Sequence, residues 1–335
     1  MKIVINNKTI KSDIRSRCLN SNQFTLEQLY KLCRLTDMIR KICSTKEGAN
    51  YVSTLLDDKR AILYFKQSST RTFLSFKNAC HILGIKSSDI RDVNTSSAIK
   101  GETELDAIKT FSQYTDLTII RHPSTDFIYS VSDYLDEDIR IINAGSGIDQ
   151  HPTQALLDFY TIYKYGIENK TIAFVGDLRR GRTVRSLALL LNKVDNVKFY
   201  FVAPNGYQIT QDIIEQLNVD YEITDDFDKI ITIVDIIYMT RLQDEYGGIE
   251  EAWDEKRYKI DSGNIDRIKK NSIILHPLPR RDEIAHEIDD DPRAKYWEQT
   301  ENGLWIRVAL IATMFNITAD LLENKYKDIS INYHI

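Results

Sequence analysis

The sequence predicts an α/β protein with two domains, each of them a parallel sheet flanked by helices. Short apolar runs alternate with longer helical patterns along most of the chain, which is typical of parallel sheets with helices on both faces. More than half a dozen predicted strands in 335 residues fit two domains of ordinary size better than one. Apolar residues make up 42% of the chain, which is enough for two hydrophobic cores.

Seven runs are predicted to be strands because they are short, apolar and bounded by polar segments. They are residues 61–65, 117–120, 140–143, 171–175, 198–202, 236–239 and 273–275. Helical patterns occupy residues 25–42, 72–83, 154–165 and 182–191, and the tail after Trp305 is helical again at 308–315. The best domain boundary is near residues 143–147, and the tail could pack on either domain.

Composition and charge exclude several classes of protein. The net charge is −5, from 44 basic and 49 acidic side chains, which argues against a general nucleic-acid binder, so any anion site must be local. The first residues lack the apolar core of a signal peptide, and no segment approaches the roughly 18 apolar residues of a membrane span. We expect a cytoplasmic protein with reduced thiols and no metal site, because no C-x-x-C pair occurs among Cys18, Cys33, Cys43 and Cys80.

Ser69, Thr70, Arg71 and Thr72 lie where the strand at 61–65 turns into a helix. Ligands of open α/β sheets bind beyond the carboxyl ends of strands, and a helix N-terminus there offers free N–H groups and a positive dipole end. With hydroxyls and a guanidinium added, the stretch predicts an anion cradle, most naturally for phosphate. Ordinary N-capping beside a surface arginine explains the same residues equally well.

His151-Pro152-Thr153-Gln154 begins another helix. His151 and Gln154 are three residues apart and can face the same way, so they could polarise a carbonyl or bind an amide group. Taken alone, the stretch favours a capping histidine and a satisfied glutamine.

Further cations and hydroxyls follow other strands or lie in polar loops. Arg182 follows the strand–turn Val175-Gly176-Asp177, which lacks the G-x-G-x-x-G spacing of a dinucleotide site, and it could hold a carboxylate. The other candidates are Arg121, Arg241, Gln243, Ser96, Lys100, and the backbone of Pro277 and Leu278. Each alone could belong to a solvated loop. Together they imply positioning and charge neutralisation of a multiply anionic substrate set, without a metal or an activated nucleophile.

The motifs resemble, in order, those of the aspartate carbamoyltransferase family of catalytic chains, from about residue 24 to the end. They are Ser69-Thr70-Arg71-Thr72, His151-Pro152-Thr153-Gln154, Gly176-Asp177-Leu178 with Gly181-Arg182-Thr183, Met239-Thr240-Arg241-Leu242-Gln243, and His276-Pro277-Leu278-Pro279-Arg280. The His-Pro-Leu-Pro form differs from the His-Cys-Leu-Pro form of ornithine carbamoyltransferases. The implied fold is two Rossmann-like domains, with the C-terminal helix packing back on the first. Residues 1–145, completed by 306–335, would bind carbamoyl phosphate, and residues 146–305 would bind aspartate.

The resemblance also implies a role for each candidate residue. Carbamoyl phosphate would contact Ser69, Thr70, Arg71, Thr72, Ser96, Lys100, Arg121, His151, Gln154, Pro277 and Leu278. L-Aspartate would contact Lys100, Arg182, Arg241 and Gln243. The catalytic residues would be Arg71, Thr72, Lys100, Arg121 and His151. Thr72, Arg121 and His151 would stabilise the carbonyl oxygen while the leaving phosphate accepts the proton.

The implied assembly is a homotrimer with shared active sites, because Ser96 and Lys100 would reach into a neighbouring subunit. A separate regulatory chain is left open, and no cofactor is expected. The implied product, N-carbamoyl-L-aspartate, belongs to de novo pyrimidine biosynthesis. Two alternatives stay open, a carbamoyltransferase with a different amine acceptor and a non-catalytic ligand-binding paralogue.

Phe73 and Lys77 depart from the family pattern, which often has Arg and Glu at these positions. The spacing is that of an intrahelical ion pair, and both members are replaced together. We hypothesise that the usual pair braces the helix and that Phe73 packs against an apolar surface instead. The alternative is that the loss of an arginine near the phosphate weakens carbamoyl-phosphate binding.

Overall fold

The computed structural model describes residues 2–5, 8–11, 13–91, 101–147, 150–244 and 257–332. The chain divides into two compact units, of which the first comprises Met1–Thr153 with Gly303–Ile335 and the second Gln154–Asn302. The divisions fall within the helices α7 (Pro152–Lys164) and α11 (Tyr296–Met314). None of the described helices is both long and apolar enough to cross a membrane.

The first unit contains a five-stranded parallel sheet in the order β3-β7-β6-β4-β5. Its strands are β3 (Arg17–Cys18), β4 (Arg60–Phe65), β5 (Lys86–Ile90), β6 (Leu117–His122) and β7 (Arg140–Ser146). A two-stranded antiparallel hairpin, β1 (Lys2–Ile5) with β2 (Lys8–Lys11), precedes the sheet. The register shifts between Ile120 and His122, which places this irregularity at Arg121, the predicted site residue.

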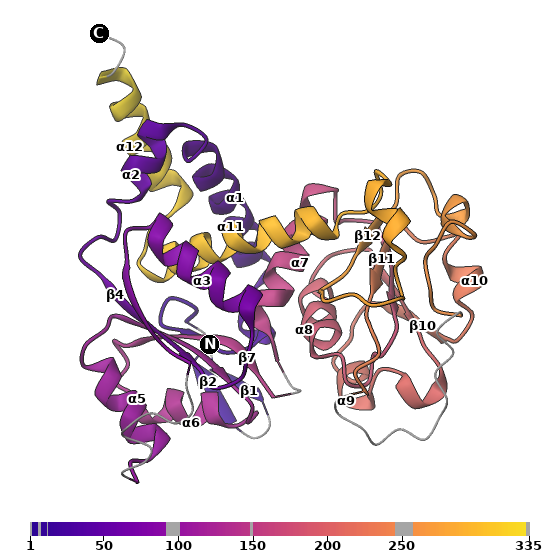
Figure 1. The fold of residues 1–335 in the computed structure, drawn as a ribbon, viewed down its shortest axis with the longest axis horizontal. Helices are drawn as coiled ribbons and strands as arrows, with labels where there is room; N and C mark the ends of the chain where they lie inside the picture. Colours follow the sequence, from indigo (N-terminus) through magenta and orange to yellow (C-terminus); the bar gives the residue numbers. More distant parts are fainter. Residues whose placement is uncertain are drawn as a thin grey trace. The chain divides into compact units, whose positions relative to one another are not determined.

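Helices cover both faces of the first sheet (Figure 1). They are α1 (Leu26–Ile42), α2 (Lys46–Val52), α3 (Thr70–Ile82), α5 (Glu104–Ser112) and α6 (Phe127–Tyr134), with a 3-10 turn at Ser21–Gln23. One core joins α5 and α6 to the sheet through Ile108, Ile128, Val131, Ile120 and Ile141. Burial of such apolar side chains is the main force that holds the helices on the sheet.

The C-terminal helices pack on the first unit, as predicted. The helix α12 (Ala319–Asn332) lies against α1. In α11, the Arg307 guanidinium lies 5.0 Å from the centroid of the Phe76 ring in α3. The helix predicted at 308–315 is longer than expected, because α11 begins at Tyr296, before Trp305.

The second unit contains another five-stranded parallel sheet, in the order β10-β9-β8-β11-β12. Its strands are β8 (Thr171–Val175), β9 (Lys198–Val202), β10 (Asp220–Thr224), β11 (Ile236–Met239) and β12 (Ile273–Leu275). Helices α8 (Arg182–Leu191), α9 (Gln211–Ile214) and α10 (Phe227–Ile230) connect them, with 3-10 turns at Asn205–Tyr207 and Ile265–Arg267. A further 3-10 turn, His286–Asp290, follows the last strand. The predicted fold class, two parallel sheets flanked by helices, is confirmed.

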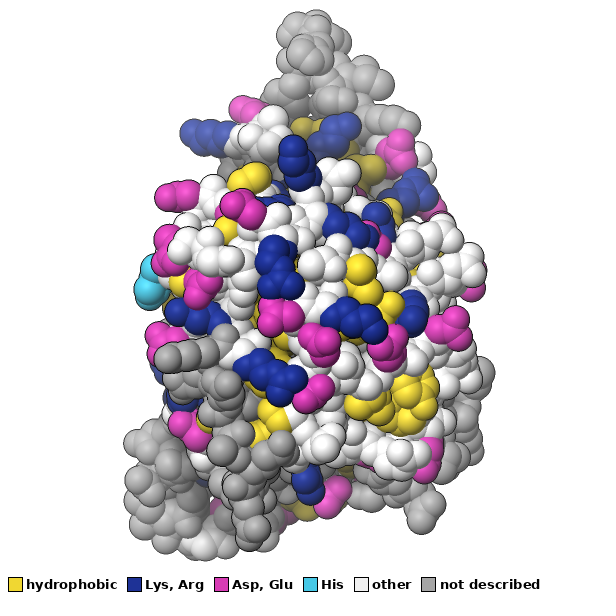
Figure 2. Space-filling model, turned by 90° about the vertical axis from the view of Figure 1, so that its right-hand side faces the viewer, with side chains coloured by type: hydrophobic (Ala, Val, Ile, Leu, Met, Phe, Trp, Pro, Cys, Tyr) yellow, Lys and Arg dark blue, Asp and Glu magenta, His cyan; other side chains and the backbone are white. Residues whose placement is uncertain are grey.

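The two faces of this sheet have different cores because successive side chains of a strand point to opposite faces. Ile237 and Met239 of β11 belong to a cluster that also includes Phe227 and Ile230 of α10 and several buried residues between Tyr258 and Tyr296. Tyr238 points the other way, where its ring contacts Phe174. On the outside, Figure 2 shows Lys and Arg side chains interspersed with Asp and Glu, as the balanced composition predicts.

Candidate active site

The predicted phosphate cradle lies at the turn from β4 into α3. Ser69 is the N-cap residue of α3, with an extended backbone, and its side chain makes no capping hydrogen bond. Arg71 is exposed, whereas Thr72 is buried. The first N–H groups of a helix have no intrahelical acceptor, so a ligand oxygen at this turn can accept from them.

The same turn is tied to β6, the strand that carries Arg121. The backbone N–H groups of Lys66 and Gln67 both donate to the Arg121 carbonyl, at 2.9 and 3.4 Å. The cradle and Arg121 therefore lie at the carboxyl ends of two neighbouring strands, β4 and β6.

Arg121 and His151 meet in the interior of the first unit. The Arg121 Nη1 donates to the Ala144 carbonyl at 3.0 Å and lies 3.3 Å from His151 Nε2. A guanidinium can only donate, so His151 Nε2 accepts and the imidazole is neutral, with its proton on Nδ1. Both side chains are buried, at 6% and 4% exposure, which strengthens their interaction with any charge that develops beside them.

Gly145 makes this arrangement possible. Its φ is +121°, and a Cβ there would lie only 2.6 Å from Arg121 Nη1 and 3.4 Å from His151 Cδ2. A side chain at this position would therefore strain the backbone and displace the guanidinium.

Gln154 is oriented by a carboxylate that sequence reasoning left without a role. Buried Asp158, four residues later, accepts hydrogen bonds from Gln154 Nε2 at 2.9 Å, Gln299 Nε2 at 2.6 Å and the Tyr238 hydroxyl at 2.7 Å. Since a carboxylate only accepts, Gln154 must direct its NH₂ to Asp158, and its Oε1 is left to accept from a ligand N–H. Burial, and then the charge of Asp158, hold the pKa of Tyr238 well above its usual value, so the hydroxyl keeps its proton.

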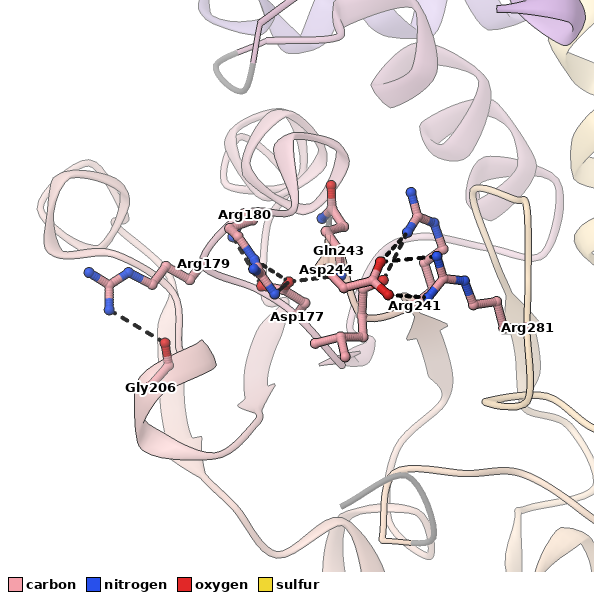
Figure 3. Close-up of polar contacts among 9 residues, drawn as sticks. Asp177, Arg179, Arg180, Gly206, Arg241, Gln243, Asp244 and Arg281 are labelled. Atoms are coloured by element: carbon pink, nitrogen blue, oxygen red, sulfur yellow. Dashed lines mark hydrogen bonds and ion pairs between the residues drawn. The ribbon is translucent and has the colours of Figure 1, made fainter. Parts of the chain in front are cut away.

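Asp177 joins the carboxyl ends of β8 and β11 (Figure 3). Its fully buried carboxylate accepts from Arg180 Nε at 2.7 Å, from the Arg180 backbone N–H at 3.2 Å and from the Gln243 N–H at 3.1 Å. A Cβ at Gly181, the N-cap of α8, would lie 3.6 Å from Gln243 Nε2. The start of α8, with Arg182, and the loop of Arg241 and Gln243 are therefore neighbours, so sequence reasoning underrated Asp177, which it quoted only as part of a motif.

The loop after β12 is fixed by His276. Its Nδ1 accepts from the Leu278 N–H at 2.8 Å, so the proton lies on Nε2, which donates to Glu283 at 2.7 Å. Burial lowers the pKa of His276 and keeps the ring neutral. Leu278 has a φ of +53°, and its bond to Pro279 is cis. Arg280 of the same motif is bound by Asp289 and by the Tyr296 hydroxyl, so its role is structural.

The predicted site residues thus fall into two sets. In the first unit the structure brings together Ser69, Thr70, Arg71, Thr72, Arg121 and His151. In the second unit Arg182 begins α8 next to Gly181, whose added Cβ would lie 3.6 Å from Gln243 Nε2, and Arg241 and Gln243 follow β11. Gln154 begins the unit, and Pro277 and Leu278 follow β12. Ser96 and Lys100 lie outside the described residues.

A cavity of about 610 Å³ in the first unit contains none of these residues. It is lined by residues 13–15, by α1 and by residues 313–320. Its arginines are already paired, Arg15 with Asp13 at 2.8 Å and Arg34 with Asp320 at 3.0 Å. We assign this cavity no part in the chemistry.

Phe73 packs inside the first unit, next to the phosphate cradle. It is 6% exposed, and its ring meets Phe65 of β4 edge to face, with centroids 5.5 Å apart. Lys77 pairs with Asp89 of β5 at 2.5 Å, and Arg91 lies over the Phe73 ring at 4.4 Å. This packing supports the hypothesis that position 73 stabilises the helix by apolar contact in this chain.

Phe73→Arg is therefore expected to lower the free energy of unfolding by about 3 kcal/mol, because it removes a buried ring and places a cation beside Lys77 and Arg91. The double variant Phe73→Arg/Lys77→Glu, which restores the family pair, should recover part of that loss. Urea unfolding measures both. The KM for carbamoyl phosphate should stay within about twofold of the parent value, and a large fall in the single variant would contradict the packing hypothesis and favour a direct role in phosphate binding.

Comparison with known proteins agrees with this geometry. The family model of the aspartate/ornithine carbamoyltransferase carbamoyl-P binding domain matches residues 17–164, and that of the Asp/Orn binding domain matches residues 168–314. The chain belongs to the aspartate/ornithine carbamoyltransferase family, which confirms the resemblance seen in the motifs.

Several similar proteins are aspartate carbamoyltransferases. The catalytic subunit of Vibrio cholerae is 40% identical over 269 residues, which are 78% of this chain and 87% of that one. That of Methanocaldococcus jannaschii is 40% identical over 264 residues, 77% and 85% of the two chains. The structure of Trypanosoma cruzi aspartate transcarbamoylase in complex with carbamoyl phosphate and aspartate superimposes with a TM-score of 0.81, at 34% identity, over 88% of this chain and 95% of that one.

Proposed function

We propose that this chain is an aspartate carbamoyltransferase, which transfers the carbamoyl group of carbamoyl phosphate to the α-amine of L-aspartate. The products are N-carbamoyl-L-aspartate and phosphate, in de novo pyrimidine biosynthesis. The observation that carries the proposal is the likeness, over 88% of the chain, to an enzyme solved with both substrates. The His-Pro-Leu-Pro motif and the arginines of the second unit favour aspartate over another amine acceptor.

In the proposed mechanism the first unit holds the phosphate and the carbonyl oxygen of carbamoyl phosphate. Ser69, Thr70, Arg71 and Thr72 hold its phosphate at the N-terminus of α3. Arg121, His151 and Thr72 stabilise the carbonyl oxygen, on which negative charge builds when the amine attacks. Gln154 accepts from the carbamoyl NH₂ through Oε1, the orientation that its bond to Asp158 supports. The carbonyls of Pro277 and Leu278 complete the pocket.

The second unit supplies the acceptor site. Arg182, Arg241 and Gln243 hold the two carboxylates of aspartate and direct its neutral amine to the carbamoyl carbon. The tetrahedral adduct collapses as the C–O bond to phosphate breaks, and the leaving phosphate takes the proton of the amine. The chemistry therefore depends on positioning and on charge stabilisation, without a dedicated protein base.

We also propose a cytoplasmic homotrimer in which Ser96 and Lys100 complete the active site of a neighbouring subunit. A regulatory chain is compatible with this assembly. The free thiols of Cys18, Cys33, Cys43 and Cys80 support a reducing compartment.

The test is a carbamoyl-transfer assay on the purified chain, with aspartate, ornithine and putrescine as parallel acceptors and ureido product as the readout. Product with aspartate alone is expected. Product with another amine would show that the acceptor is not aspartate, and it would contradict the proposed roles of Arg182, Arg241 and Gln243 as aspartate ligands. A trimer without product, verified by its mass in solution, would favour the ligand-binding alternative.

A further inference from the structure

A two-pronged ion pair joins the loops that follow β11 and β12 in the second unit (Figure 3). Arg281 donates from Nη1 to Asp244 Oδ2 at 2.9 Å and from Nη2 to Asp244 Oδ1 at 3.0 Å. Both side chains are about half exposed, at 51% and 56%. Exposed ion pairs contribute little to stability, with bidentate pairs at the upper end of the range, so this pair adds little to the energy of folding.

Arg281 extends from a fixed backbone. Its N–H donates to Glu283 Oε1 at 3.1 Å, the same oxygen that His276 Nε2 reaches at 2.7 Å. The His276 and Glu283 side chains are 1% and 9% exposed. The buried pair therefore sets where the Arg281 guanidinium can reach.

Asp244 also lies near Arg241, the residue assigned to a substrate carboxylate. Arg241 Nη1 is 4.0 Å from Asp244 Oδ1 and donates to the Leu242 carbonyl at 2.8 Å. The loop thus carries its own carboxylate three residues from the arginine that must bind the carboxylate of aspartate. A carboxylate in that position competes with the substrate for the guanidinium.

We propose that Arg281 is a positioning residue that holds the Asp244 carboxylate and so reduces its competition with aspartate for Arg241. This inference rests on the proposed role of Arg241. Two arginines and one aspartate give the cluster a net charge of +1, which attracts an anionic substrate. Without Arg281 the net charge is zero, and Asp244 can turn fully to Arg241.

The test is a double-mutant cycle in the full-length, assembled enzyme. We expect Arg281→Gln to raise the KM for aspartate about tenfold, with a much smaller change in kcat. The reason is that Asp244 then competes with the substrate for one charge-assisted hydrogen bond from Arg241. Asp244→Asn alone should leave this KM unchanged or lower it. In Asp244→Asn/Arg281→Gln the KM should return to within about twofold of the parent value, since the competing charge is gone.

The alternative is that the ion pair only holds the two loops together, and this alternative predicts the opposite result for the double variant. In that case either single substitution breaks the ion pair, and both raise the KM for aspartate equally. The double variant then shows no rescue. This result would overturn the proposal. Arg267→Gln is the matched control, because Arg267 also pairs with an exposed aspartate, Asp228, on elements of the same unit that carry no site residue. It should leave the KM unchanged.

Calorimetric binding of succinate, a dicarboxylate without the reactive amine, separates this proposal from the proposed function. Succinate should bind about tenfold more weakly to Arg281→Gln and recover in the double variant. If the parent enzyme makes no product from aspartate but succinate follows this pattern, the acceptor assignment fails and the role of Arg281 stands. If neither succinate affinity nor KM responds, the role of Arg281 is wrong.

Discussion

Gly145→Ala is expected to reduce kcat by about a hundredfold or more, the loss typical of removing one donor to a developing oxyanion. The new Cβ would lie 2.6 Å from Arg121 Nη1, closer than Cβ atoms approach other atoms, so the guanidinium must leave its place beside His151. The positive φ of +121° adds strain of about 1–3 kcal/mol. Steady-state kinetics should show the fall in kcat with little change in the KM for aspartate, because that substrate is assigned to the second unit.

Gly166→Ala separates the effect of strain from that of displacement. Gly166 also has a positive φ, +80°, but the nearest atom to its added Cβ is the Lys170 side chain at 4.0 Å. This variant should lose stability and keep its kcat. If folded Gly145→Ala protein retained kcat within about threefold of the parent, Arg121 would not stabilise the carbonyl oxygen in the way proposed.

Among the strands of the two parallel sheets, those that sequence reasoning missed are very short or largely exposed, whereas the edge strand β12 is buried and was predicted. The predicted runs at 171–175, 198–202, 236–239 and 273–275 match β8, β9, β11 and β12 residue for residue. The strands β3, β5 and β10, at edges of the two sheets, were missed. Lys86–Ile90 and Asp220–Thr224 are largely exposed and polar, so they lack the apolar signal that burial on both faces imposes on a central strand.

The motifs point to the residues assigned to a ligand more directly than to the residues that hold them in place. Ser69–Thr72 and Arg121 follow strands, and their hydroxyl and guanidinium groups in that position make them candidates for an anion site. Asp158 has no such signal, because its partners Tyr238 and Gln299 are 80 and 141 positions away in sequence. The link from Asp177 to Gln243 spans 66 positions and depends on β8 and β11 being neighbours, an order that apolar periodicity does not reveal.

The second large effect is expected from Asp177→Asn. The substitution leaves the Arg180 guanidinium, whose side chain is only 10% exposed, without its counter-charge. In either orientation its amide NH₂ also faces a donor, the Arg180 backbone N–H at the Oδ1 position or Arg180 Nε and the Gln243 N–H at the Oδ2 position. We expect the free energy of unfolding to fall by about 3 kcal/mol and the KM for aspartate to rise by at least about tenfold, since the loop of Arg241 and Gln243 loses its anchor.

A second variant separates the rise in KM from a loss of stability. It breaks a comparable ion pair elsewhere in the same unit, away from the proposed acceptor site. Asp291 supplies that comparison, because its carboxylate accepts from Arg293 Nε at 2.8 Å, Nη2 at 2.7 Å and the Arg293 N–H at 2.9 Å, with both side chains mostly buried. Asp291→Asn should lower stability to a similar extent and leave the KM for aspartate unchanged. If the KM for aspartate were equal in Asp177→Asn and Asp291→Asn, Asp177 would have only a structural role. A rise confined to Asp177→Asn would show that the acceptor site depends on the contact between the ends of β8 and β11.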